Sequence, residues 1–312
     1  MSDPAARACE GYTAAAAAPL RAARLRADML LLTAALVWGS GFVAARIGAQ
    51  HLDPWVYNGL RFLLGAVVLL PLVIRRLRGL SRIELWGGLA AGLLLLAASN
   101  LQQVGLAFTT AGQAGFVTGL YVVLVPLFQA LLLRRWPRWH AWVASILAAI
   151  GLFLLSGVGR LRLSVGDAWE LGGAALWAAH ILLIGRLVPQ VDALRLALVQ
   201  YLACGLLSAA VGFVVAPQPL AGLGTAGWAI AYNGVLSVGV GFTLQALGQR
   251  HAPATDSAVI MSLEAVFAAL FGWLLLREAL AWPQIVGCTL MLAGMLLAQI
   301  QNGAAHARQS ER

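Results

Sequence analysis

Ten apolar runs of membrane-spanning length restrict the fold of this sequence more than any other feature. A helix needs about 20 residues to cross a hydrocarbon core of ~30 Å, since each residue adds ~1.5 Å. The sequence therefore predicts an all-α membrane protein with ten transmembrane helices, each edge placed within a few residues. The spans are 28–48, 54–74, 84–108, 111–133, 139–157, 168–188, 194–215, 226–249, 254–276 and 282–301.

The composition agrees with a polytopic membrane protein rather than with soluble domains. Hydrophobic residues make up 61% of the chain and charged residues 11%, and the mean hydropathy is +0.84. The loops are about ten residues long at most, so they leave no room for a soluble catalytic domain. The cysteines and histidines show no metal-ligand or redox spacing. We expect no metal, no cofactor and no enzymatic activity, and any chemistry must occur within the helix bundle.

The net charge of +9 comes from arginine alone, because the chain contains no lysine. The arginines stand in short runs between apolar segments, at 75–78 and 134–138 for example, which indicates membrane topology rather than nucleic-acid binding. Sixteen of the 21 arginines become cytoplasmic if the N-terminus is cytoplasmic. The positive-inside rule thus predicts both termini in the cytoplasm, with tails at 1–27 and 302–312. We expect the protein in a cell membrane, the inner membrane of a bacterium.

The second half of the chain repeats the first. At an offset of 143 residues Gln102 aligns with Gln245, and nearer the start of each half an offset of 139 aligns Trp38 with Trp177. Amides and tryptophans that recur in one register are difficult to explain by composition. The chain is therefore interpreted as a duplicated membrane protein, and duplication is typical of transporters.

The predicted repeats are 28–157 and 168–301, joined by a linker at 158–167. Each contains five helices, and because five is odd, the second repeat enters the membrane from the opposite side. Such inverted repeats allow each half to adopt the conformation of the other, so that a central site can open to either face.

Glu264 is the strongest candidate for a functional residue. It lies about ten residues from each end of its span, where a charged side chain costs about 3 kcal/mol on insertion scales. Its counterpart in the first repeat is Tyr121, so the two polar groups are expected to flank the central axis. We favour a carboxylate that binds a cationic solute group or carries a proton. The alternative is a neutral, structural glutamic acid that is hydrogen-bonded to a neighbouring helix.

Arg61 is a second candidate for binding or carrying charge. It lies about seven residues, or ~10 Å, inside its span from Pro54. The side chain could meet an anionic group, or it could snorkel outward, pair with Asp53 or bind a backbone carbonyl. Its repeat counterpart is Gln200, so the scaffold does not require the charge.

Amide and aromatic side chains extend the candidate binding site. Amides in membrane helices commonly bond across helices, but their clustering at one depth favours a pocket. An aromatic pair could stack on a solute or a cation, although such tryptophans also serve in packing. His180 is one turn from Trp177 on the same helix face. The additional candidates are Trp38, Asn100, Gln102, Gln103, Trp177, His180 and Gln245.

Residues 100–126 and 262–278 closely resemble the EamA type of the drug/metabolite transporter superfamily. The resemblance covers all ten spans. It implies an inner-membrane carrier of small organic solutes, often an exporter of amino acids, metabolites or toxic compounds, with a cavity lined by both repeats. Family members often have proline at the position of Ala265 and glycine at that of Arg277. We therefore expect a straighter ninth helix and an additional charge on the outer side.

The leading hypothesis is a secondary transporter that exports a small organic solute by alternating access, with protons as a possible coupling ion. Its expected partners are the solute, the bilayer and protons, without nucleic acid and in no specified oligomeric state. One alternative is a membrane-embedded enzyme acting on a lipid or peptide, but the nearest pair, Ser262 and Glu264, points about 200° apart on a helix. Another is a non-transporting scaffold, in which the central polar residues would only destabilise the bundle.

Overall fold

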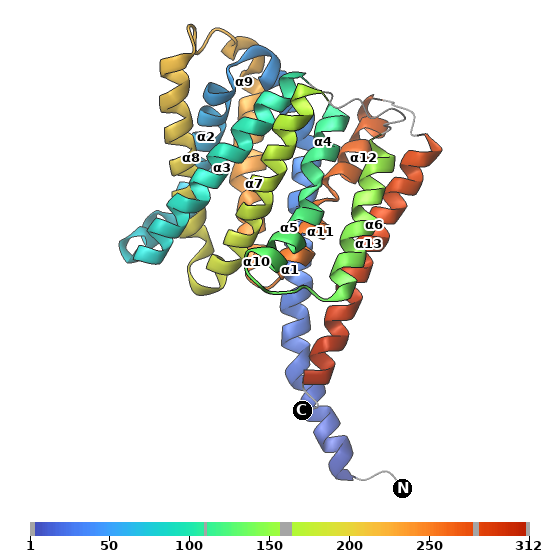
Figure 1. Ribbon diagram of the computed structural model, residues 1–312. Coiled ribbons are helices and arrows are strands. Elements are labelled where there is room, and N and C mark those ends of the chain that lie inside the picture. Colours follow the sequence, from blue (N-terminus) through green and yellow to red (C-terminus); the bar gives the residue numbers. More distant parts are fainter. Residues whose placement is uncertain (1–3, 109–110, 157–163, 277–280, 310–312) are drawn as a thin grey trace.

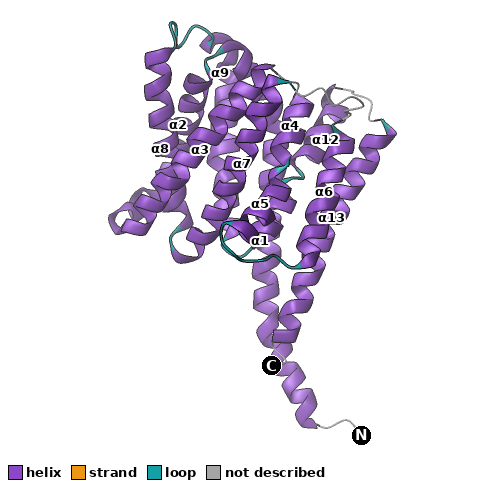
Figure 2. Ribbon diagram, in the orientation of Figure 1, coloured by secondary structure: helices purple, strands orange, loops and turns teal. Residues whose placement is uncertain are grey.

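The computed structural model describes residues 4–108, 111–156, 164–276 and 281–309. Every regular element in these ranges is helical (Figure 2). The elements are α1 (Pro4–His51), α2 (Pro54–Val73), η1 (Ile74–Gly79), α3 (Arg82–Phe108), α4 (Ala111–Gly119), α5 (Tyr121–Leu131), α6 (Trp139–Leu155), α7 (Val165–Leu187), η2 (Val188–Gln190), α8 (Ala193–Val215), α9 (Leu223–Tyr232), η3 (Asn233–Phe242), α10 (Thr243–Gln249), α11 (Ala254–Met261), α12 (Glu264–Leu276) and α13 (Trp282–Gln309).

Eight helical segments of the described chain are long and apolar enough to cross a membrane. Two shorter apolar helices, Trp139–Leu155 and Trp282–Ala298, fall at the fifth and tenth predicted spans. Large apolar side chains are exposed on the outside of the bundle, among them Val67, Leu93 and Val214. Contact with lipid tails explains this exposure, since it would be unfavourable in water. The chain is therefore a multi-pass membrane protein.

The first helix is longer than the predicted span. It runs without interruption from Pro4 to His51, and its apolar, membrane-crossing part is Ala22–His51. The alanine run at 14–18 favours helix, because alanine has the highest helix propensity. In Figure 1, α1 and α13 both extend beyond the rest of the bundle at the end where the two termini lie.

The fourth and ninth spans are each interrupted near the middle. α4 gives way to α5 at Leu120, and α11 gives way to α12 at Ser262 and Leu263. At both breaks a backbone N–H donates to the carbonyl three residues earlier, from Leu120 to Val117 and from Leu263 to Ile260, each at 3.2 Å. The two tight turns are 143 residues apart and are therefore equivalent in the repeat.

The expectation that Ala265 would straighten the ninth helix is wrong. The helix breaks immediately before Glu264 without a proline at position 265. Gly39 of α1 packs against the first turn after this break, so closely that a β-carbon at Gly39 would collide with the Glu264 carbonyl. The expected outer charge at Arg277 lies outside the described residues.

Corresponding helices of the two halves pack against each other in opposite directions. Gly151 of α6 lies against Gly287 of α13, and Gly294 lies against Ala144, so the order of contacts along one helix is reversed along the other. α2 and α8 are related in the same way, with Gly59 against Ala209 and Gly212 against Val56. α2, α3 and α8 form the left side of Figure 1, and α6 and α13 form the right.

Candidate functional site

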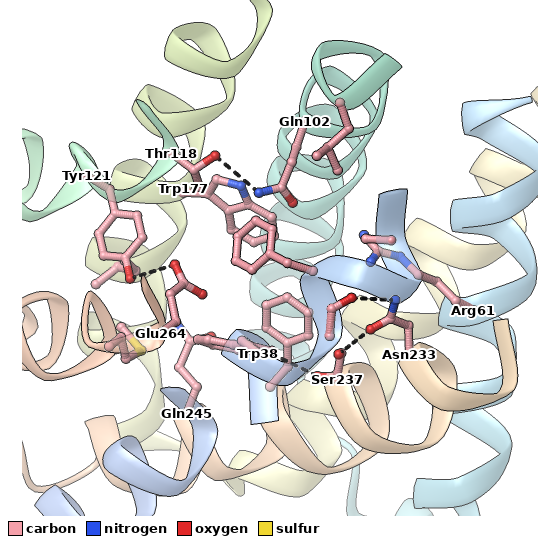
Figure 3. Close-up of a pocket in the computed structure, with 17 residues that line it drawn as sticks. Trp38, Arg61, Gln102, Thr118, Tyr121, Trp177, Asn233, Ser237, Gln245 and Glu264 are labelled. Atoms are coloured by element: carbon pink, nitrogen blue, oxygen red, sulfur yellow. Dashed lines mark hydrogen bonds between the residues drawn. The ribbon is translucent and has the colours of Figure 1, made fainter. Parts of the chain in front are cut away.

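A cavity of about 80 Å³, enough for several water molecules, lies near the middle of the bundle between the two halves and is lined by both polar and apolar side chains (Figure 3). Helices from both repeats contribute to its wall. Its lining residues are Trp38, Gly41, Phe42, Ala45, Arg61, Gln102, Leu106, Thr118, Tyr121, Trp177, Ile181, Asn233, Ser237, Phe242, Gln245, Met261 and Glu264. Seven of the ten residues predicted from the sequence are in this set.

Tyr121 and Glu264 meet directly in this cavity. The Tyr121 hydroxyl donates a hydrogen bond of 3.3 Å to Glu264 Oε1, and the two residues are 4% and 6% exposed. They are equivalent positions of the two repeats at the offset of 143. Each is also the first residue after a helix break. A carboxylate in the first turn of α12 is favoured by the helix dipole, which helps to hold it in the membrane.

Arg61 lines another part of the same cavity. Its guanidinium carbon lies 5.4 Å from the ring centroid of Tyr57 and 5.2 Å from that of Phe62, within cation–π range. Arg61 is 7% exposed, and its Nε has no hydrogen-bond partner. The alternative pairing with Asp53 is wrong, since that carboxylate caps α2 by accepting from the Trp55 N–H at 2.9 Å. Arg61 is therefore available to an anionic group in the cavity.

The two predicted tryptophans lie on the cavity wall with Phe242 between them. The Phe242 ring is 4.9 Å from Trp38 and 5.6 Å from Trp177, and it stacks on Trp177 at an interplanar angle of 15°. The Trp38 indole N–H donates to the Ser237 carbonyl at 3.1 Å. The aromatic wall is thus a cluster of three rings rather than an isolated pair.

The repeat-related amides Gln102 and Gln245 also reach the cavity. Gln102 Nε2 donates to Thr118 Oγ1 at 3.2 Å, and Gln245 Nε2 donates to Gln249 Oε1 at 3.0 Å. In each case the carboxamide is held within one half of the bundle. A solute in the cavity would therefore meet an oriented amide from each repeat.

The structure places Asn100, Gln103 and His180 outside the cavity lining. Gln103 Nε2 donates to the Ala45 carbonyl at 2.9 Å, and a His180 ring nitrogen lies 3.0 Å from Gln200 Oε1. These contacts join neighbouring helices, as expected for polar side chains that stabilise helix packing.

Asn100 has a similar bridging position. Its Oδ1 accepts from Asn58 Nδ2 at 3.0 Å, and its Nδ2 donates to Ser208 Oγ at 3.1 Å. It connects α3 to α2 and α8, on the side of the helix that faces away from the cavity. The sequence predicted Asn100 and Gln102 together because they lie at a similar depth in the membrane. Two residues apart on an α-helix, however, they point to different sides of it.

The lining residues Asn233, Ser237 and Phe242 were not predicted as site residues. All three lie on the π-helix η3, where Ser237 Oγ donates to Asn233 Oδ1 at 2.6 Å and Asn233 Nδ2 donates to Tyr57 Oη at 2.7 Å. π-Helical turns are wider than α-helical turns and are frequent at functional sites. The polarity of Asn233 was a visible signal, but a period of 3.6 residues cannot show which face a π-helix presents.

Ser262, the nearest nucleophile to Glu264, is turned away from it. Its hydroxyl donates to the Val259 carbonyl at 2.8 Å, and the side chain is fully buried. The described residues also contain no cluster of three or more histidine, cysteine or acidic side chains suited to a metal.

A bundle of membrane-spanning helices with a buried cavity between two repeated halves defines a multi-pass membrane carrier. Residues 25–157 and 164–299 each match the EamA-like transporter family. The chain belongs to this family, with two copies of its domain, and it is a membrane transporter.

Relatives agree with this assignment. An uncharacterized transporter from Archaeoglobus fulgidus is 30% identical over 286 residues, which are 89% of this chain and 87% of that protein. The threonine/homoserine exporter RhtA of Salmonella typhimurium is 32% identical over 178 residues, or 54% of this chain and 58% of RhtA. A solved crystal structure has the same fold, with a TM-score of 0.74 and 20% identity, covering 88% of this chain and 96% of the other.

Proposed function

We propose that this protein is a secondary transporter that exports small organic solutes across the inner membrane by alternating access. The contact between Tyr121 and Glu264 carries the proposal. It joins equivalent residues of the two halves and lines the cavity. A group at this position can be exposed to either face when the two halves exchange conformations.

The reversed packing of α6 on α13 and of α2 on α8 supports ten spans arranged as two inverted repeats. The proposed repeats are 28–157 and 168–301, with the linker at 158–167. An odd number of helices per half requires the inversion, and the arginine distribution favours cytoplasmic termini. In this arrangement the two broken helices approach the axis from opposite sides, one from each half.

The proposed solute is small, with an anionic end, a cationic end and some apolar surface. Figure 3 shows Arg61 on one side of the cavity and Glu264 with Tyr121 on the other, with Trp38 and Trp177 between them. A solute carboxylate would pair with the unpartnered guanidinium, and an ammonium group would pair with the carboxylate. An α-amino acid has this charge arrangement, and RhtA is named for the export of two amino acids.

In the proposed cycle Glu264 holds either the solute ammonium group or a proton. The Tyr121 hydroxyl, which belongs to the opposite half of the bundle, donates a hydrogen bond that orients the Glu264 carboxyl group. When a proton replaces the departing cation, the carboxyl group stays neutral while the cavity changes sides, which avoids moving an unpaired charge through the membrane.

An export assay in cells tests direction and substrate class together. Cells loaded with threonine or homoserine, with and without the protein, would be compared for release of the amino acid to the medium. We expect faster release with the wild-type protein and basal release with Glu264→Gln, at equal membrane levels. Equal release of both amino acids, and of a wider metabolite panel, with and without the protein would contradict the proposed function.

A further inference from the structure

A second buried acid, Glu170, lies beside the cavity. It is on α7, one turn after Asp167, and is 0% exposed. Thr118 Oγ1 donates to Glu170 Oε2 at 2.7 Å, whereas Glu170 Oε1 is buried without a hydrogen-bond partner. A carboxylate with one hydrogen bond and no cation among the described residues would be strongly destabilised inside a membrane protein, so this geometry suits the neutral acid.

The opposite half of the protein has no acid at the equivalent place. Leu31 corresponds to Glu170 at the offset of 139, and Met261 corresponds to Thr118 at the offset of 143. Leu31 and Met261 belong to one buried apolar cluster. The two repeats therefore meet at two equivalent places. At one of them the contact is an apolar pair, and at the other it is formed by a threonine and an acid.

The packing around the two counterparts is otherwise the same. A β-carbon on Gly105 would lie 2.7 Å from Glu170 Cγ, and a β-carbon on Gly248 would lie 2.7 Å from Leu31 Cγ. These glycines are also equivalent in the repeat. In both halves a side chain of similar length packs against a glycine, and of the two side chains only Glu170 carries an ionisable group. Packing does not account for the choice of glutamate.

Thr118 connects Glu170 to the cavity. Its hydroxyl accepts from Gln102 Nε2 at 3.2 Å while it donates to Glu170, and both Thr118 and Gln102 line the cavity (Figure 3). In the part of the chain that the structure describes, few other ionisable groups lie on the helices packed around this acid. Asp167 precedes it on α7, Tyr121 follows Thr118 by one turn on α5, and the ionisable residues of α3, Arg82 and Glu84, are at the other end of that helix.

We propose that Glu170 is a second proton-binding carboxyl group, which exchanges its proton with the cavity through the Thr118 hydroxyl. A proton from cavity water binds to Thr118 Oγ1 as the hydroxyl proton passes to Glu170 Oε2, which leaves a neutral threonine and a neutral acid. The reverse step returns the proton to water. In transport, which rests on the proposed function, Glu170 stores the proton while Glu264 holds the solute.

Infrared spectroscopy of the purified protein in lipid nanodiscs tests proton binding without a solute. Spectra recorded over a pH series report the C=O stretch of protonated carboxyl groups. We expect a band that disappears reversibly at high pH, is missing in Glu170→Leu and remains in Glu264→Gln. In Thr118→Met the same band should persist but exchange more slowly in D2O. Identical spectra for wild type and Glu170→Leu at every pH would overturn the proposal.

Glu170→Leu and Thr118→Met each introduce the residue that stands at the equivalent position of the opposite half, so we expect both variants to fold. Circular dichroism and gel filtration would verify folding, and Glu170→Gln, of nearly the same shape, provides a second variant for the same spectra. An unchanged carboxyl band in both variants would also overturn the proposal.

Transport in proteoliposomes then separates this inference from the proposed function. For threonine or homoserine, we expect Glu170→Leu to keep exchange between equal pools but to lose accumulation driven by a pH gradient. Undiminished pH-driven accumulation in Glu170→Leu would overturn its role in coupling. Absence of transport in the wild type would contradict the proposed function instead, and the infrared result would stand on its own.

Discussion

At the scale of single residues, the positions where the two halves differ are those that give the cavity its charge. Glu264 faces Tyr121 across the axis, and Arg61 occupies the position that Gln200 holds in the other half. The counterparts are polar but uncharged. Since the scaffold holds the neutral residue in one half, packing alone does not require the charged residue in the other.

Replacing Arg61 with its counterpart tests this reasoning. We expect Arg61→Gln to raise the KM for an anionic or zwitterionic solute at least tenfold, because a hydrogen bond to a charged group contributes about 1.5–3 kcal/mol. Arg61→Lys keeps the charge without the planar fork and should have a smaller effect. Thermal stability of Arg61→Gln should not fall, since no carboxylate pairs with Arg61 in the described residues. An unchanged KM in Arg61→Gln would exclude the guanidinium from solute binding.

Asn100 and Gln102 provide a matched pair of substitutions on one helix. Asn100→Ala removes the partner of Ser208 and one of the two hydrogen bonds of Asn58, which still donates to the Ser99 carbonyl. We therefore expect a loss of about 1–3 kcal/mol in stability with little change in KM for the folded protein. Gln102→Ala alters the cavity wall, so KM should change more than the unfolding temperature. Thermal unfolding and transport of both variants provide the measurement, and the opposite pattern would contradict the assignment of roles.

The sequence identified the charged residues of the cavity but not all of its wall. Glu264 and Arg61 were recognisable because an ionisable group within a span is costly. Phe242 was not, because a phenylalanine in an apolar helix carries no signal of its own, and its position depends on the π-helix. Glu170 was also overlooked, since it stands only two residues inside the predicted span, where acids are usually explained by the helix end.

At the scale of helices, the places where spans are interrupted determine the geometry of the site. The breaks before Tyr121 and Glu264 bring the two side chains to the first turn of α5 and α12. No residue pattern in these apolar segments announces the breaks, because neither has a proline at the turn itself. α1 packs closely against the first turn after the second break, at Gly39, and hydropathy cannot reveal this contact.

Close helix packing makes a prediction for two glycines. A β-carbon on Gly287 would lie 2.5 Å from the Gly151 carbonyl oxygen, whereas Gly227 on α9 has no neighbour within 4 Å of that position. We expect Gly287→Ala to destabilise the protein by about 1–3 kcal/mol through overpacking. Gly227→Ala should be neutral or stabilising by about 0.5–1 kcal/mol, because alanine favours helix. Thermal unfolding in one detergent measures both, and equal midpoints would contradict the close contact of α6 and α13.

At the scale of the whole molecule, the repeat explains more of the structure than any local pattern. The offset of 143 pairs Tyr121 with Glu264, and the two are hydrogen-bonded. The contacts of α6 with α13 follow the same offset, since Gly151 against Gly287 corresponds to Gly294 against Ala144. Sequence offsets specify which residues are related by symmetry, but they contain no information on helix rotation. For this reason the repeat relates Tyr121 to Glu264 but does not predict the whole cavity wall.

The proposed topology predicts the sides on which two loops are exposed. In a cysteine-free background, Gln218→Cys, between α8 and α9, should react with a membrane-impermeant maleimide on intact spheroplasts. Leu80→Cys, between η1 and α3, should react only after the membrane is permeabilised, because this loop follows the arginine run at 75–78. The reverse pattern of labelling would place the termini on the outer side.

The central claim is that solute and proton are handled where the two halves meet at Glu264. The most direct measurement is accumulation of threonine or homoserine in proteoliposomes, driven by a pH gradient, for wild type, Glu264→Gln and Tyr121→Phe. We expect accumulation in the wild type, none above protein-free liposomes in Glu264→Gln, and a partial loss in Tyr121→Phe, which removes only the hydrogen bond. Wild-type accumulation in folded, correctly inserted Glu264→Gln would exclude that carboxyl group from the mechanism and contradict this account.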